Sequence, residues 1–274
     1  FLLARKLQLP LLTQMHDLWY ENTKLNSFSR ALARKYEKVI FQYADKNFCM
    51  TSTQQDYFKK KYPDLTFDML PHCVPKSEEN YFRKTSDIEK NEYTILYTGN
   101  ISRAMNLDAL QQLLSCIKYL PKKYRIKMLV SLSEQECKNY NIYHEDIIYD
   151  WVSVEQSKKL IRKADLLFLP LSFNNCSTHE VRTVYATKTL DYLKSGTPIL
   201  VFSPPESFHS MDASCKGWGY VVDKDDPEFL AQSIIKVLQN EPLKRNLVLK
   251  AQDEAKNRHP DFYCNYLNTI IEVL

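Results

Sequence analysis

The chain has 274 residues, of which 44% are hydrophobic and 26% are charged, the composition of an ordinary globular protein. Only 4 of them are glycines, where the usual ~7% would supply about nineteen. This shortage argues against glycine-rich phosphate loops, and neither G-x-x-x-x-G-K-S/T nor G-x-G-x-x-G occurs. A formal net charge of +4 is too small to indicate a nucleic-acid-binding protein.

The positions of the charged residues and of the cysteines indicate the kind of partner and the cellular compartment of the protein. The basic excess falls within residues 1–90, where it fits an anionic partner, a membrane surface or simply a solvated face. The 7 cysteines are odd in number, scattered and without a C-x-x-C pair, which predicts reduced thiols in the cytoplasm rather than disulfides or a zinc site. The longest apolar run, around Leu166–Leu171, is much shorter than the ~20 residues of a membrane span.

The beginning of the chain does not have the order of a signal peptide. Phe1–Ala4 is apolar and is followed at once by Arg5 and Lys6, whereas a signal peptide carries its charges before its apolar stretch. We expect this start to lie inside a helix, and we therefore expect a preceding N-terminal segment to be missing.

Strand-like runs alternate with helical patterns along the whole chain, which predicts an α/β fold with parallel sheets. In the first third, strands are predicted at 11–15, 47–50 and 67–70, and helices at 28–43 and 52–61. Two prolines, Pro71 and Pro75, and the polar residues 76–91 then form a predicted linker.

The pattern is more regular in the rest of the chain. Strands are predicted at 94–98, 126–131, 147–152, 165–171, 199–202 and 220–222. Helices are predicted at about 106–120, 134–140, 154–163, 187–195, 227–239, 243–258 and 261–273. The continuous apolar run Leu166–Leu169 is typical of a strand that is covered on both faces of a sheet.

Gly99 ends the predicted strand 94–98 and precedes the helix predicted near Asn106. A glycine at the carboxyl end of a parallel strand lets a ligand approach the backbone, and a following helix N-terminus favours phosphate. Arg103, in the connecting loop, could add a charge-assisted contact. Alternatively, Gly99 only turns the chain and Arg103 is solvated.

The segment Thr187–Ser195 followed by Gly196 is typical of a helix that ends in a left-handed glycine. Lys188 and Asp191 are three residues apart and therefore share one face near the start of this helix. There they could hold a diphosphate and a ribose hydroxyl, or they could simply form an ion pair with each other.

The segment after the last predicted β–α–β unit contains two further patterns. Gly217 and Gly219 flank Trp218 and indicate a tight entry to the last strand. Asp223–Asp225 is a D-x-D pattern, whose carboxylate oxygens are hard ligands that could bind a divalent metal. Because Asp226–Glu228 has the pattern of a helix N-cap and first turn, we interpret the run as a loop and cap.

Five segments together carry a family resemblance: Leu70–Pro75, Tyr97–Arg103, Ala164–Pro170, Thr187–Leu200, and Gly217–Val222 with Asp225–Glu228. In this order they resemble the group 1 glycosyltransferases, family 4 of the sequence classification. The resemblance implies the GT-B fold, with two Rossmann-like domains and parallel sheets, the first domain being incomplete. It implies a partial acceptor-side domain and linker at 1–90, a nucleotide-sugar-binding domain at 91–255, and a C-terminal helix at 256–274 able to pack back on the first domain.

The resemblance also implies a reaction. A sugar would pass from a nucleotide-diphosphate-sugar donor, such as a UDP- or GDP-sugar, to a hydroxyl of a surface polysaccharide or lipid-linked glycan. The anomeric configuration would be retained, and neither a metal nor a cofactor would be needed. The enzyme would work in the cytoplasm, with peripheral contact between its first domain and the inner face of the membrane as an option.

Residue by residue, the resemblance predicts catalytic roles for His16, Arg103 and Lys188. It predicts that donor binding uses Gly99, Asn100, Arg103, Thr187, Lys188 and Asp191. In this prediction the basic side chains hold the departing diphosphate, His16 contacts the donor sugar and phosphate, and Asp191 binds the ribose as the second Glu of the family's E-x7-E motif does.

The chain departs from the family pattern at several positions. The usual Arg after the strand-ending glycine is Asn100, and the usual Lys a few residues later falls near Met105. The first Glu of E-x7-E falls at Thr183, although Glu180 and Arg182 nearby are candidate sugar contacts. Two other hypotheses stay open: a sugar-nucleotide epimerase, which shares this fold, and a non-catalytic sugar-nucleotide-binding module, because the acceptor domain is incomplete and two basic positions have changed.

Overall fold

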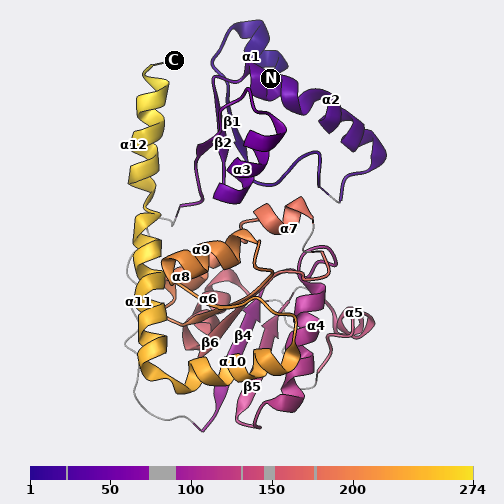
Figure 1. The fold of residues 1–274 in the computed structure, drawn as a ribbon, viewed down its shortest axis with the longest axis vertical. Coiled ribbons are helices and arrows are strands. Elements are labelled where there is room, and N and C mark those ends of the chain that lie inside the picture. The colour runs from indigo at the N-terminus through magenta and orange to yellow at the C-terminus, as the bar shows by residue number, and fades with distance from the viewer. Residues whose placement is uncertain (23, 74–90, 131, 145–151, 176–177, 274) are drawn as a thin grey trace.

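The computed structural model describes residues 1–22, 24–73, 91–130, 132–144, 152–175 and 178–273. The chain forms two α/β units, which we call the first unit and the second unit in chain order (Figure 1). The short helix α7 (His179–Thr183) lies between them, and the C-terminal helices α11 (Glu241–Asn257) and α12 (Pro260–Ile271) run along the side of both. The α/β class with parallel sheets is therefore confirmed.

The first unit contains a three-stranded parallel sheet in the order β1-β2-β3. Its strands are β1 (Leu12–Met15), β2 (Lys46–Cys49) and β3 (Asp68–Met69), and its helices are α1 (Leu2–Leu7), α2 (Ser27–Tyr43) and α3 (Ser52–Lys61). The core of the unit consists of Leu18, Phe41, Cys49, Phe58 and Phe67. The strands and the two longer helices lie within one or two residues of their predicted positions.

The second unit contains a five-stranded parallel sheet in the order β5-β4-β6-β7-β8. Its strands are β4 (Tyr93–Thr98), β5 (Tyr124–Leu129), β6 (Leu166–Pro170), β7 (Ile199–Phe202) and β8 (Tyr220–Val222). Strand β5 lies on one side of β4, and the next strand along the chain, β6, lies on the other side, so the strand order reverses between β4 and β6. In open parallel sheets, ligands bind beyond the carboxyl ends of the strands at such a reversal. The strand predicted at 147–152 falls almost wholly outside the described residues.

The helices of the second unit cover both faces of its sheet. They are α4 (Leu107–Ser115), continued by a 3-10 turn (Cys116–Tyr119), α5 (Glu134–Asn139), α6 (Val154–Lys163), α8 (Lys188–Lys194), α9 (Phe208–Lys216) and α10 (Pro227–Gln239). The sequence did not predict α7 or α9. Gly217 has a φ of 75° and ends α9, which gives this glycine a role that the interpretation as a strand entry had missed. Gly196, with a φ of 72°, follows α8 in the left-handed conformation predicted for it.

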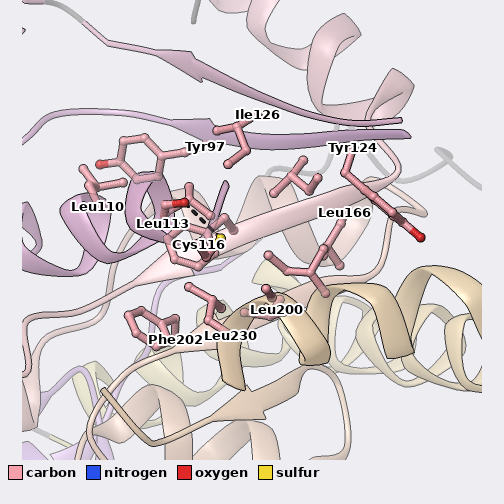
Figure 2. Close-up of a cluster of buried hydrophobic side chains, with 14 of the residues drawn as sticks. Tyr97, Leu110, Leu113, Cys116, Tyr124, Ile126, Leu166, Leu200, Phe202 and Leu230 are labelled. Carbon is pink, nitrogen blue, oxygen red and sulfur yellow. Dashed lines mark hydrogen bonds between the residues drawn. The ribbon is translucent and has the colours of Figure 1, made fainter. Parts of the chain in front are cut away.

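One large core cluster lies between the sheet and the helices α4 and α10 (Figure 2). It includes Ile126, Leu166 and Leu200 from the strands, with Leu110 and Leu230 from the helices. These strand residues are almost fully buried, as a strand covered on both faces requires. A second cluster on the opposite face of the sheet includes residues of α6, α8 and α11. The sheet is thus packed against helices on both of its faces.

The two units touch directly. The Thr51 hydroxyl at the start of α3 donates a buried hydrogen bond of 2.8 Å to the Thr183 carbonyl at the end of α7. The rings of Tyr57 and His179 lie 4.6 Å apart on the same two helices. On the other side, the Tyr266 hydroxyl of α12 donates to Asp68 at 3.2 Å.

Two further findings concern membrane-spanning helices and disulfide bonds. Within the described ranges, no helix is both long enough and apolar enough to cross a lipid bilayer. The described cysteines are free thiols: Cys49, Cys73, Cys116, Cys137, Cys215 and Cys264.

Candidate active site

A cavity of about 520 Å³ opens beyond the carboxyl ends of β4 and β6, at the reversal of strand order. This volume suits a small-molecule ligand. Its wall is formed by Thr98, Gly99, Asn100, Ser102, Met105, Asn106, Ser157, Pro170, Leu171, Val184, Ala186, Thr187, Lys188 and Asp191. The structure therefore brings together five residues predicted from widely separated segments: Gly99, Asn100, Thr187, Lys188 and Asp191.

Gly99 and Lys188 fit each other closely at this cavity. Gly99 has a φ of 123°, a conformation that residues with a side chain rarely adopt. A Cβ atom at this position would lie 2.7 Å from Nζ and 3.0 Å from Cε of Lys188. The positive φ therefore favours glycine at this position, and an added methyl group would force the end of the Lys188 side chain to move.

The Lys188 ammonium has an unusual environment for a cation. Its Nζ lies 4.0 Å from the centre of the Tyr97 ring, a cation–π contact. Among the described residues, no carboxylate lies within ion-pair distance of it, and Asp191 pairs instead with Lys194 at 3.3 Å. Burial lowers the pKa of Lys188 to about 7. The simple Lys188–Asp191 ion pair is therefore not formed, and the ammonium faces the cavity without a counter-charge.

Tyr97 also shapes the loop that follows β4. Its hydroxyl donates a 2.6 Å hydrogen bond to the Asn100 carbonyl and accepts one of 3.0 Å from the Asn106 side-chain amide. The Asn106 side-chain oxygen in turn accepts the Ser102 N–H at 2.9 Å. Burial raises the pKa of Tyr97, so its hydroxyl keeps its proton and remains a donor. This network links the loop between Gly99 and the start of α4 to the Tyr97 hydroxyl.

A buried histidine supports the segment before α8. The His209 side chain accepts the Ala186 N–H through Nε2 at 3.3 Å, and the same nitrogen lies 3.1 Å from the Thr189 hydroxyl. Burial lowers the pKa of His209 to about 4, which keeps the ring neutral near pH 7. Sequence reasoning missed this residue because it missed α9; the only local signal was Ser207, which caps that helix.

Two predicted catalytic residues lie outside the cavity. The Arg103 guanidinium lies 5.2 Å from the centre of the Tyr140 ring and does not contribute to the cavity wall. His16 contributes to a second cavity, of about 110 Å³, between the two units. The other residues of this smaller wall are Asp17, Leu18, Asn22, Lys24, Ala104, Met105, Glu180, Thr183 and Val184. Because Met105 and Val184 line both cavities, the two spaces adjoin each other.

The acidic run before α10 has the structural role predicted for it. Asp226 caps the helix by accepting the N–H groups of Glu228 and Phe229, each at 3.0 Å. Lys224 pairs with Asp226 at 3.4 Å. Burial and the nearby Asp108 carboxylate raise the pKa of Asp225.

The chain matches one protein family over most of its second unit. Residues 78–254, more than half of the chain, match the family model described as glycosyl transferases group 1. A comparison with curated proteins finds no match by sequence.

Solved structures of similar fold cover the whole chain. HepE from Anabaena, solved in complex with UDP-glucose, has a TM-score of 0.73 and 13% identity, over 100% of this chain and 75% of HepE. Sucrose-phosphate synthase from Thermosynechococcus elongatus has a TM-score of 0.70 and 13% identity, over 99% of this chain and 70% of the synthase. A trehalose-phosphate synthase (UDP-forming) from Burkholderia vietnamiensis has a TM-score of 0.66 and 8% identity, over 98% and 71% of the two chains.

At such identities these structures show the fold, which is GT-B, and the family model shows the family. The predicted resemblance is confirmed on both counts. The family match over residues 78–254 agrees with the five segments found along the chain and with the cavity at the reversal of strand order. The chain belongs to the group 1 glycosyltransferases, enzymes of class EC 2.4.

Proposed function

We propose that the protein transfers a sugar from a UDP-sugar to a hydroxyl group of a glycan or lipid-linked acceptor. The observation that carries this proposal is the Lys188 ammonium, which lies against Gly99 at the 520 Å³ cavity and has no carboxylate partner in the described part of the chain. An uncompensated cation at the carboxyl end of parallel strands is suited to hold a diphosphate. Because HepE was solved with UDP-glucose, a uridine nucleotide is the first donor to test.

The backbone near Gly99 limits where phosphate oxygens can bind. The Gly99 N–H donates to the Leu129 carbonyl at 3.0 Å, so it is already engaged. The N–H groups of Ser102, Met105, Asn106 and Leu107 are also bonded within this loop. The main contact to a phosphate would therefore come from the Lys188 ammonium, assisted by the dipole of α4, which favours an anion at the start of the helix. Asp191, also on the cavity wall, would accept hydrogen bonds from the ribose hydroxyl groups.

The transfer step would proceed with retention of configuration. The bond between the anomeric carbon and the phosphate oxygen breaks, and the acceptor oxygen forms its bond on the same face of the sugar. The acceptor proton passes to an oxygen of the departing diphosphate, whose negative charge grows in the transition state. Lys188 would stabilise this charge, and electrostatic stabilisation of this kind often contributes more to catalysis than any other effect. We therefore propose that a lysine, rather than a metal ion, supplies the positive charge.

The smaller cavity between the units would hold the donor sugar. Its wall is rich in groups that bind hydroxyls, including His16, Asp17 and Glu180. Since it adjoins the larger cavity at Met105 and Val184, a nucleotide-sugar could extend from one space into the other. In this arrangement His16 contacts the sugar from the first unit, while Lys188 contacts the diphosphate from the second.

A thermal-shift panel of UDP-, GDP-, ADP- and dTDP-sugars tests the donor. We expect a UDP-sugar to raise the melting temperature, and Lys188→Ala to abolish that increase, whereas the exposed Lys159→Ala should keep it. The products then distinguish the possible reactions, since free UDP with a glycosylated acceptor supports transfer and an isomerised nucleotide-sugar would indicate an epimerase. Donor binding without any turnover would contradict the proposal and favour a binding module.

We also propose that the first unit contacts a membrane on the cytoplasmic side. Large apolar side chains of α1 and α2 are exposed, among them Leu2 at 74% and Phe28 at 73%. Basic residues of the same helices, such as Arg5, Lys6 and Lys35, lie between them in sequence and are also exposed. Apolar and basic side chains together favour binding to an anionic lipid surface. Flotation with phosphatidylglycerol vesicles tests this, and equal recovery with phosphatidylcholine vesicles alone would contradict it.

A further inference from the structure

His16 is placed by a neighbouring ring rather than by hydrogen bonds. It is exposed at the end of β1, and its imidazole lies 4.9 Å from that of His72, with 49° between the ring planes. An exposed side chain with freely rotating bonds has no fixed direction unless something packs against it. Among the ring contacts of the described residues, His72 is the neighbour that restricts His16.

His72 follows β3, at the end of the first unit, and its ring reaches the second unit. It lies 5.9 Å from the ring of Tyr185, with 48° between the planes. Tyr185 is itself buried and held on two further sides. Its ring stacks on His209 at 5.7 Å and 25°, and the Arg258 guanidinium lies 4.9 Å from its centre. His16, His72 and Tyr185 thus form a column of rings that is anchored in the core of the second unit.

The base of this column is the segment that leads into the donor cavity. Tyr185 immediately precedes Ala186, whose N–H is bound by His209, and Ala186, Thr187 and Lys188 all line the 520 Å³ cavity. The ring that supports His72 is therefore three residues from Lys188 in the chain, on the same segment that lines the cavity.

We propose that His72 is a positioning residue of the transfer reaction. Its ring packs on Tyr185 of the second unit and directs His16 of the first unit toward the smaller cavity, which would hold the donor sugar. This inference rests on the proposed function, in which His16 contacts the donor sugar. It explains how a side chain from the first unit is aligned with a donor that binds to the second.

The protonation state of His72 suits this role. Burial lowers the pKa of His72, and the neighbouring His16 and Arg258 lower it further, against an opposite effect of Asp17. A neutral ring packs between His16 and Tyr185 without the repulsion that two imidazolium groups at this distance would produce.

The kinetic test compares His72→Leu with the conservative His72→Phe, using UDP-glucose as donor and both hydrolysis and transfer as assays. A misplacement of about 1 Å in a reacting group can cost on the order of a hundredfold in rate. We expect His72→Leu to lower kcat ten- to a hundredfold on this basis, with the donor Kd unchanged within about twofold, and His72→Phe to restore most of kcat. An unchanged kcat in His72→Leu, or a donor Kd that weakens in step with kcat, would overturn the proposal.

A second measurement does not depend on turnover. Histidine ring signals in NMR spectra can be assigned with His16→Gln, and we expect His72→Leu to displace the His16 signals, as should Tyr185→Leu. His16 signals that stay unchanged in a folded His72→Leu variant would refute the column. If the unmodified chain binds no donor while His16 still responds to residue 72, the proposed function fails and the column stands.

Discussion

The Lys188 side chain lies directly against the Cα atom of Gly99, so that a methyl group at residue 99 would stand 2.7 Å from the lysine ammonium. Gly99 directly follows β4 and Lys188 is the first residue of α8, and the two meet at the wall of one cavity. The glycine thereby allows the lysine to reach a position between the backbone and the Tyr97 ring. The shape of the candidate donor site depends on this contact.

Gly99→Ala should therefore damage the site. The new methyl group displaces the Lys188 ammonium, and a φ of 123° adds backbone strain of about 1–3 kcal/mol. We expect the affinity for UDP-glucose to fall by roughly ten- to a hundredfold, the value of a lost hydrogen bond to a charged group. Gly217→Ala is the matched control, because φ is also positive there but the nearest atom, Lys250 Cγ, is 3.7 Å away. Calorimetry should show weaker binding only for Gly99→Ala, and equal weakening in both variants would contradict the assignment.

Donor binding should depend on pH through Lys188. Its pKa of about 7 means that about half of the side chains are neutral at pH 7 in the free protein. A bound diphosphate favours the charged form and raises the pKa, so binding takes up a proton and weakens as the pH rises above 7. We expect the Kd for UDP-glucose to rise roughly tenfold between pH 7 and 8.5.

Calorimetry in buffers of different ionisation enthalpy measures that proton directly. Lys188→Arg is the informative variant, because a guanidinium stays charged throughout this range and should remove the pH dependence. A pH-dependent Kd that persists unchanged in Lys188→Arg would assign the effect to another group.

The elements could be predicted from the sequence wherever apolar residues form a continuous run or a one-sided pattern. The strands β7 and β8 and the helices α6 and α10 have the bounds that their patterns predicted, because continuous apolar runs and clear caps such as Asp226 define them. Helix α9 lacks this signal, since its buried side chains include His209 and Ser210. Polar residues at core positions mask the apolar period on which prediction depends.

The candidate site was predictable to the extent that motifs mark strand ends and helix starts. Gly99, Lys188 and Asp191 could be placed on one cavity because parallel strands end at the same edge of a sheet. The direction of Arg103 could not be predicted, because its guanidinium packs on the ring of Tyr140 at the end of α5, a residue distant in sequence. Nor could the contact of His16 with His72 be predicted, because it depends on how the segments after β1 and β3, which flank β2 in the sheet, approach each other.

The stability of the second unit should depend on a buried ion pair at the end of α11. Arg258 donates to Glu254 at 2.8 Å, and both side chains are more than nine-tenths buried. Glu254→Leu would leave the guanidinium buried without its main partner, which typically costs about 3–5 kcal/mol. Glu155→Leu, which breaks the exposed pair with Lys159, should cost less than about 1 kcal/mol. Urea unfolding measures the free energy of unfolding of both variants. Equal losses would show that the buried pair contributes no more stability than the exposed pair.

The central claim is that Lys188 stabilises the departing diphosphate. The most direct measurement is the rate of UDP release from UDP-glucose at saturating donor, compared between the unmodified chain, Lys188→Ala and Lys159→Ala. Removing one such stabilising contact typically costs on the order of 10²–10³ in rate, and that loss is predicted for Lys188→Ala while Lys159→Ala stays at the unmodified rate. A Lys188→Ala protein that releases UDP as fast as the unmodified chain would contradict the account.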